Sequence, residues 1–102
     1  MTKELRGAEV ELCFRTAEQG GRSAPLLIEP GAYRPHFVAP GGDYLGVVVT
    51  RGPSEPVSPG VLVGVVVSFP YDVSYDALSE GTAFEVMEGE RLVGDGRVLR
   101  LF

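Results

Sequence analysis

The sequence offers few side chains of the kinds that catalyse reactions. His36 is the single histidine, the residue type that serves most often as a general acid or base near neutral pH. A hydrolytic triad would combine His36 with Asp43 and a serine, but the Gly-x-Ser-x-Gly pattern typical of such serines does not occur. Cys13, the single cysteine, has no neighbour in sequence that would activate its thiol. An enzyme built around His36 or Cys13 is therefore the weakest of three hypotheses, and we expect no catalytic residues.

Metal and nucleotide sites are also not indicated. Glu85, Glu88 and Glu90 form an acidic cluster, but the cluster lacks the alternating Asp and Asn ligands around a glycine that an EF-hand loop needs. We interpret it as a solvated face. The sequence Gly-Asp-Gly at 94–96 precedes no helical pattern, and no Gly-x-x-x-x-Gly-Lys-Ser/Thr loop is present. We expect no metal, no cofactor and no nucleotide.

Length and charge narrow the classes of partner. The 102 residues match one domain of ordinary size, so we expect residues 1–102 to form a single domain. Asp and Glu number 14 against 9 Lys and Arg, which gives a formal net charge of −5. That sign is wrong for a protein that holds a phosphate backbone by general electrostatics. Nucleic-acid binding is disfavoured for this reason.

The cysteine count and the hydrophobic pattern bear on location. One cysteine cannot form an internal disulfide, which is typical of proteins from a reducing compartment. Residues 1–7 lack the apolar region of a secretory signal. The longest apolar stretch, 61–67, falls well short of the roughly 20 residues that span a bilayer. We expect a cytoplasmic protein without a membrane partner.

The elements that must position any site are short strands. The chain contains 14 Gly and 8 Pro, spaced so that almost no stretch can form a three-turn helix. Residues 8–15 alternate apolar and polar side chains, which predicts a strand with one face in the core. A second strand is predicted over 34–39, where Pro35 restricts the strand to an edge or to a start. Continuous apolar runs over 44–50 and 61–69 predict strands buried on both faces.

The remaining segments complete the predicted fold. A Pro-rich loop is expected over 51–60, and 71–80 is compatible with either a helical turn or other turns. Residues 82–88 and 91–102 predict a hairpin with its turn at residue 89. About six strands result, enough for a small closed all-β barrel. Residues 1–7 are expected to be flexible.

Two early motifs resemble a known family. Residues 18–25 read Glu-Gln-Gly-Gly-Arg-Ser-Ala-Pro, and residues 31–37 read Gly-Ala-Tyr-Arg-Pro-His-Phe. They are similar to the Glu-Gly-Gly-Arg-x-Thr-Pro and Gly-Tyr-Arg-Pro-Gln-Phe signatures of the C-terminal domain of elongation factor Tu.

Four further stretches continue the resemblance in the same order. Asp-Tyr-Leu-Gly at 43–46 and Ser-Pro-Gly at 58–60 look like that family's Asp-Val-Thr-Gly and Met-Pro-Gly-Asp. The glycine-containing stretches 80–86 and 88–96 resemble two more of its motifs. The likeness covers residues 8–102 and implies a six-stranded antiparallel closed β-barrel. It implies no GTP hydrolysis, because the family's GTPase domain has no counterpart in this sequence.

The resemblance also implies positions that would face a partner. In the family this domain holds the T-stem of aminoacyl-tRNA, contacts the GTPase domain and docks the nucleotide exchange factor. At the positions that touch tRNA, this chain has Ser23, Ala24, His36 and Leu45, and all four differ from the family. The resemblance therefore implies a retained scaffold whose RNA-facing surface has changed.

Arginines and one insertion complete the candidate set. Arg22, Arg34 and Arg91 are kept, and their guanidinium groups either pair with carboxylates inside the fold, which we favour, or present charge to a partner. The apolar residues 26–30 are longer than the family's link, and both a partner surface and core remain open for them. The candidate partner-facing or RNA-facing residues are Arg22, Ser23, Ala24, Arg34, His36 and Leu45.

Two hypotheses stand ahead of the enzyme hypothesis. The first is a non-enzymatic, stand-alone module that binds an unidentified protein through the altered surface. The second is an accessory of translation that binds aminoacyl-tRNA or another RNA. The second hypothesis requires the fold to assemble a basic patch from Arg15, Arg22, Arg34, Arg97 and Arg100.

Overall fold

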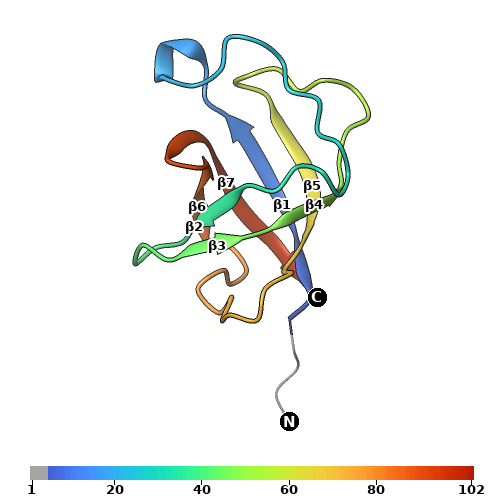
Figure 1. The fold of residues 1–102 in the computed structure, drawn as a ribbon, viewed down its shortest axis with the longest axis vertical. Helices are drawn as coiled ribbons and strands as arrows, with labels where there is room; N and C mark the ends of the chain where they lie inside the picture. The colour runs from blue at the N-terminus through green and yellow to red at the C-terminus, as the bar shows by residue number, and fades with distance from the viewer. Residues whose placement is uncertain (1–4) are drawn as a thin grey trace.

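The computed structural model describes residues 5–102, which form an all-β fold with one short 3-10 helix (Figure 1). In chain order the elements are β1 (Gly7–Phe14), η1 (Ala17–Gln19), β2 (His36–Val38), β3 (Tyr44–Gly46), β4 (Val48–Arg51), β5 (Leu62–Ser68), β6 (Ala83–Glu88) and β7 (Arg91–Leu101). No helix in this part of the chain is long and apolar enough to cross a membrane.

The expected flexible segment 1–7 falls partly outside the described residues, which begin at residue 5. Arg6 is tied to the ends of both strands that flank β1, because its N–H donates to Phe102 O, after β7, at 2.8 Å and its carbonyl accepts from Phe69 N, after β5, at 2.8 Å. Gly7 is buried and begins β1.

The strands form one antiparallel sheet that curls into a half-barrel, in the order β3-β2-β6-β7-β1-β5-β4. The predicted closed barrel of six strands is wrong, because the described sheet has seven strands and two edges, β3 and β4. These edges are consecutive in the chain and separated by Val47 alone, and they run end to end across the lower part of the molecule (Figure 1). The single strand predicted over 44–50 divides here, since β3 pairs with β2 whereas β4 pairs with β5.

The central strand β1 confirms the alternating pattern read from its sequence. Ala8, Val10, Leu12 and Phe14 are buried, whereas the residues between them are only partly buried on the outer side. β1 lies between β7 and β5, so both sides of its backbone are paired. The period of two therefore identified the core face of the central strand correctly.

The two valine-rich runs differ in burial. Of the run 44–50, residues 45–49 are buried as predicted, whereas Tyr44 and Thr50 at its ends are exposed. The prediction is wrong for 61–69, where only Val65 and Val67 are buried and the start of the run is exposed. No described strand or helix covers the outer face of β5, so only its inward side chains reach the core.

The C-terminal hairpin is confirmed. β6 and β7 pair antiparallel from Ala83 opposite Arg97 to Glu88 opposite Arg91, with an irregularity between Val86 and Met87. The chain turns at Gly89, whose φ of 61° lies in the left-handed region that favours glycine.

The open question at 71–80 is resolved in favour of turns, since no helix forms there. This loop contributes Tyr75 and Leu78 to the core, and the Tyr75 ring stacks on Phe69 with centroids 4.2 Å apart. The Tyr75 hydroxyl donates to Gly46 O at 2.6 Å and so fastens the loop to β3.

The insertion 26–30 belongs mainly to the core. Ile28 is only 2% exposed, and Leu26 is partly buried against the same core. The backbones of Leu26 and Val57 exchange two hydrogen bonds of 2.9 and 2.8 Å. Leu27 alone among the three apolar residues of this segment is exposed.

Candidate functional site

Arg22 lies at the centre of a polar cluster that joins three segments of the chain. Its Nη2 group donates to both carboxylate oxygens of Glu88, at the end of β6. The Tyr33 hydroxyl donates to Glu88 Oε2 at 2.6 Å. The side chains of Arg22 and Glu88 are 24% and 28% exposed, so the ion pair is largely shielded from water. We refer to Arg22, Tyr33 and Glu88 as the Glu88 cluster.

The electrostatics of this cluster follow from its burial. Desolvation and the hydrogen bond to Glu88 raise the pKa of the Tyr33 hydroxyl far above its ordinary value. Arg22 Nε is buried without a partner among residues 5–102. The favoured structural role of Arg22 is thus borne out by its contacts. Arg91 is exposed and forms no ion pair in the described structure, and its Nη2 donates instead to a backbone carbonyl, Gly21 O, at 3.0 Å.

The acidic cluster predicted at residues 85–90 does not behave as one solvated face. Glu85 and Glu90 are exposed, but Glu88 points inward to Arg22 and Tyr33. That part of the prediction is wrong, because a neighbouring loop brings an arginine over the end of β6. Within residues 5–102, no group of three or more His, Cys, Asp or Glu side chains is arranged to hold a metal ion.

The predicted residues next to Arg22 lie on the surface. Ser23 and Ala24 are exposed. Arg22 and Ser23 line a shallow hollow of about 400 Å³ together with Thr16 and Glu18. Arg34 is exposed, and its Nε donates to Gly31 O at 3.2 Å.

His36 and Leu45 lie on neighbouring strands but face opposite ways. In β2, His36 is partly buried and stands opposite Gly46 of β3 and Met87 of β6. In β3, Leu45 stands opposite Phe37 and is only 4% exposed, within the core. As a correction, Leu45 leaves the partner-facing set, because its alternation with exposed Tyr44 turns its side chain inward.

An aromatic surface covers the outer face of β2 and β3, and it was missed by sequence reasoning. Tyr44 is 56% exposed, and its ring centroid lies 6.1 Å from that of His36. Tyr71 is 57% exposed, and its ring lies so close to Gly46 that a β-carbon there would be 2.5 Å from Tyr71 Cε2. Val38, opposite Tyr44, completes this face. We refer to His36, Val38, Tyr44 and Tyr71 as the aromatic surface.

The aromatic surface adjoins the Glu88 cluster through β6. Met87 stands opposite His36 and immediately precedes Glu88. Arg22 and His36 are thus connected only through two consecutive residues of β6, since His36 stands opposite Met87 and Arg22 binds Glu88. One signal in the sequence could have indicated this surface: Gly46 lies inside the predicted strand 44–50, and a glycine inside a strand marks the close approach of another group.

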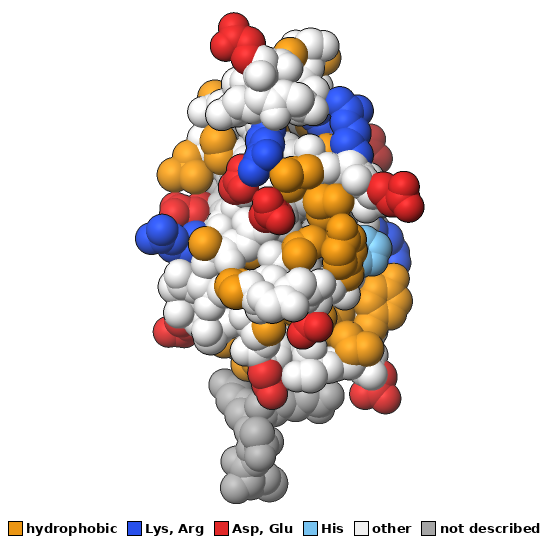
Figure 2. Space-filling view, turned by 90° about the vertical axis from the view of Figure 1, so that its left-hand side faces the viewer, with side chains coloured by type: hydrophobic (Ala, Val, Ile, Leu, Met, Phe, Trp, Pro, Cys, Tyr) orange, Lys and Arg blue, Asp and Glu red, His pale blue; other side chains and the backbone are white. Residues whose placement is uncertain are grey.

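Acidic side chains stand beside the aromatic surface. Asp43 and Asp72 precede and follow its two tyrosines in sequence, and both are exposed. Glu85, opposite Val38 on β6, is also exposed. In Figure 2, hydrophobic side chains gather along the right-hand edge around the pale-blue histidine, with a blue Lys or Arg side chain beside it and separate red carboxylates around them. Arg34 is the nearest cationic residue in sequence.

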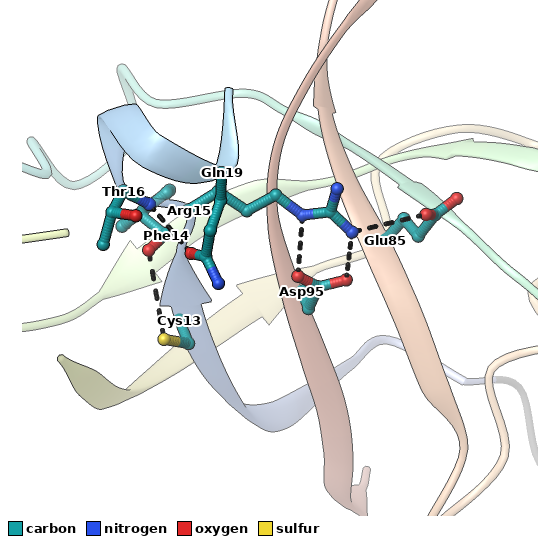
Figure 3. A network of polar contacts seen from close by, with 7 residues as sticks. All are labelled: Cys13, Phe14, Arg15, Thr16, Gln19, Glu85 and Asp95. Atoms are coloured by element: carbon teal, nitrogen blue, oxygen red, sulfur yellow. Dashed lines mark hydrogen bonds and ion pairs between the residues drawn. The ribbon is translucent and has the colours of Figure 1, made fainter. Parts of the chain in front are cut away.

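The arginines that a basic patch would need are mostly paired with carboxylates. Arg15 donates to both oxygens of Asp95, at 3.0 and 3.1 Å, and its Nη2 lies 3.8 Å from Glu85 (Figure 3). The hydrogen bond to Asp95 raises the pKa of the Arg15 guanidinium. Arg100 pairs with Glu9. With Arg22 bound to Glu88, three of the five arginines named for the patch are paired, which leaves Arg34 and Arg97 without an ion pair in the described structure.

The two residues with reactive side chains do not meet. His36 is on β2 and Cys13 on β1, and β6 and β7 lie between them in the sheet. Strands stand about 4.8 Å apart, so the two positions are separated by roughly 14 Å across the sheet. The Cys13 thiol has one polar contact, to Phe14 O at 3.9 Å. This geometry does not place a base beside a nucleophile.

No protein-family model matches the chain. The resemblance to the C-terminal domain of elongation factor Tu stays a prediction.

Proposed function

We propose that this chain is a non-enzymatic, elongation-factor-Tu-like β domain that binds another protein through its aromatic surface. The observation that supports this most directly is the pair Tyr44 and Tyr71, both more than half exposed on one sheet face. Tyrosine is enriched at protein–protein interfaces and in their energetic centres, because it buries much area at little entropic cost.

The aromatic surface is pre-organised. The Tyr71 ring lies against Gly46. The backbone N–H of Tyr71 donates to the Tyr75 hydroxyl at 3.4 Å. Tyr75 in turn donates to Gly46 O, so the loop and β3 are joined at two points. A side chain that is held in place before binding loses less conformational entropy in the complex.

Charge favours a protein over RNA as the partner. Aromatic side chains also stack on nucleic-acid bases, but such sites combine stacking with a positively charged groove. Here the exposed Asp43 and Asp72 are the sequence neighbours of Tyr44 and Tyr71, and the net charge is −5. A partner segment that presents Lys or Arg together with apolar side chains fits this surface, because the carboxylates and the tyrosine rings both attract cations.

The experiment that tests this function is affinity capture from a lysate of the source cells. The unaltered chain and the double variant Tyr44→Ala, Tyr71→Ala are used as paired baits, and bound protein and bound RNA are both quantified. The proposal predicts a protein that the unaltered chain retains and the double variant loses. Retention of tRNA in place of a protein would support the alternative, an RNA-binding accessory of translation.

A further inference from the structure

β5 is longer than the strand beside it. β4 pairs with β5 only over Val66, Val67 and Ser68, whereas β1 pairs along all of β5. Over 62–65, β5 therefore has a strand on one side only. Figure 1 shows β4 beside the lower end of β5, with no strand continuing along its upper part.

The hydrogen bonds between β4 and β5 show to which side each residue of β5 directs its backbone N–H and C=O groups. The Thr50 hydroxyl, on the β4 side, donates to Val66 O at 3.2 Å, so Val66 directs its backbone groups away from β1. In an antiparallel ladder, alternate residues direct N–H and C=O the same way. Gly64 and Leu62 therefore also direct these groups away from β1.

The pairing of β5 with β1 leads to the same assignment of which residues point away from β1. Phe14 O accepts a hydrogen bond of 2.8 Å from Gly60 N, so Phe14 and its alternate neighbours in β1 face β5. Leu12 is one of these neighbours and stands opposite Val63. Val63 thus bonds with β1, and the residues on either side of it point outward.

These outward groups lack partners in the fold. Within residues 5–102, no hydrogen bond from a turn, a loop or a side chain reaches the backbone of Leu62 or Gly64. Both residues are exposed, and no atom lies within 4 Å of the position that a β-carbon of Gly64 would take. Beside them is a hollow of about 310 Å³, lined mainly by apolar atoms of Gly52, Val66 and Leu99 among others.

We propose that this open edge of β5, residues 62–65, binds an extended peptide segment of a partner protein as an added strand. Two N–H donors and two C=O acceptors, on Leu62 and Gly64, match the groups that an extended backbone presents. The edge spans about 13 Å, so it accommodates a short segment. The hollow beside Gly64 takes one apolar side chain of that segment.

The partner is a different protein, not a second copy. Two identical chains each carry a formal net charge of −5, so their association is opposed by like charge. The open edge and the aromatic surface are made of different residues: the edge is residues 62–65 of β5, beyond its pairing with β4, whereas the aromatic surface lies on β2, β3 and the loop after β5. The inference therefore goes beyond the proposed function and does not depend on it.

The test uses peptides selected from a displayed random library on the full chain. Gly64→Pro removes one outward-pointing N–H and breaks no hydrogen bond to β1, because that N–H does not bond with β1. Gly64→Ala keeps the N–H and is the matched control. Selected peptides are expected to lose about tenfold in affinity for Gly64→Pro and to bind Gly64→Ala within about twofold. The double variant Tyr44→Ala, Tyr71→Ala is expected to bind them unchanged, which separates this test from that of the proposed function.

Hydrogen exchange on the unaltered chain adds a readout that no folding defect can obscure. The Leu62 and Gly64 amides are expected to exchange faster than those of Val63 and Val65, and to slow when a selected peptide binds. Equal affinity of the peptides for both Gly64 variants, or protection of these two amides in the free monomer, would overturn the proposal. A dimer that Gly64→Pro dissociates would overturn it too, since a second copy would then occupy the edge.

Discussion

The Tyr71 ring rests against the backbone of Gly46, on the outer side of β3. A β-carbon at residue 46 would lie 2.5 Å from Cε2 and 2.9 Å from Cδ2 of that ring. Real β-carbons do not approach other atoms so closely, so this position of the ring requires glycine. The contact joins the loop after β5 to the sheet and sets one of the two tyrosines of the aromatic surface.

Gly46→Ala is expected to displace Tyr71 and to lower the free energy of unfolding by about 1 kcal/mol. This value is at the lower end of the range for overpacking, because Tyr71 is half exposed and can move away from the added methyl group. Gly64→Ala is the matched control, since a methyl group there meets no atom, and it is expected to leave stability unchanged or raise it by about 0.5 kcal/mol. Urea unfolding and the ring resonances of Tyr71 measure both effects. Equal stability of the two variants, with unshifted Tyr71 resonances, would contradict the contact.

Glu88→Gln is expected to lower the free energy of unfolding by about 1.5–3 kcal/mol, because Arg22 then lacks its carboxylate in a largely shielded site. Glu90→Gln, an exposed change in the same turn, is the control and is expected to stay within about 0.5 kcal/mol. A double-mutant cycle with Arg22→Gln is expected to give a coupling energy of about 1 kcal/mol or more by urea unfolding. Additive single effects would show that the ion pair does not stabilise the fold.

Stability is expected to fall at alkaline pH through Tyr33 and Tyr75. Burial raises the pKa of both hydroxyls, and the hydrogen bond to Glu88 raises that of Tyr33 further. A group whose pKa is raised on folding contributes stability that is fully present below its unfolded value, about 10 for tyrosine, and lost as the pH rises toward the folded value.

Between the pKa of a tyrosine in the unfolded chain and its raised pKa in the folded chain, ionisation removes roughly 1.4 kcal/mol of stability per pH unit, and Tyr33, with the larger shift, is expected to dominate this decline. Tyr33→Phe is expected to flatten this decline, which urea unfolding as a function of pH measures. A decline equally steep in Tyr33→Phe would show that Tyr33 ionises as readily in the folded chain as in the unfolded one.

Binding to aminoacyl-tRNA is expected to be absent at physiological salt. Three of the arginines that a basic patch would need are bound to carboxylates, and acidic residues stand beside the aromatic surface. Filter binding over a range of salt concentrations measures this directly. Retention that weakens steeply with added salt would indicate several phosphate contacts and would contradict the expectation.

The local patterns predicted the local structure. The alternation in residues 8–15 predicted β1 and its core face, and the turn at Gly89 predicted the β6–β7 hairpin. Both depend on neighbours in sequence or on one face of a strand, which a period of two reveals.

Features that depend on distant pairing were not predicted. The run 44–50 contains no breaker at Val47, yet the chain there changes from pairing with β2 to pairing with β5. The burial of Leu45 and the contact of Tyr71 with Gly46 likewise depend on which segments meet across the sheet. Of the candidate residues, only His36 forms part of the aromatic surface, and the exposed tyrosines Tyr44 and Tyr71 were not anticipated.

Site-specific photo-crosslinking tests the central claim most directly. A photoreactive amino acid replaces Tyr44 in one sample and Leu27, an exposed residue outside the aromatic surface, in a matched control. Both proteins are irradiated in a lysate of the source cells, and the adducts are identified as protein or RNA. The proposed function predicts a protein adduct at position 44 that is absent at position 27. An RNA adduct at position 44, or the same protein adduct at both positions, would contradict it.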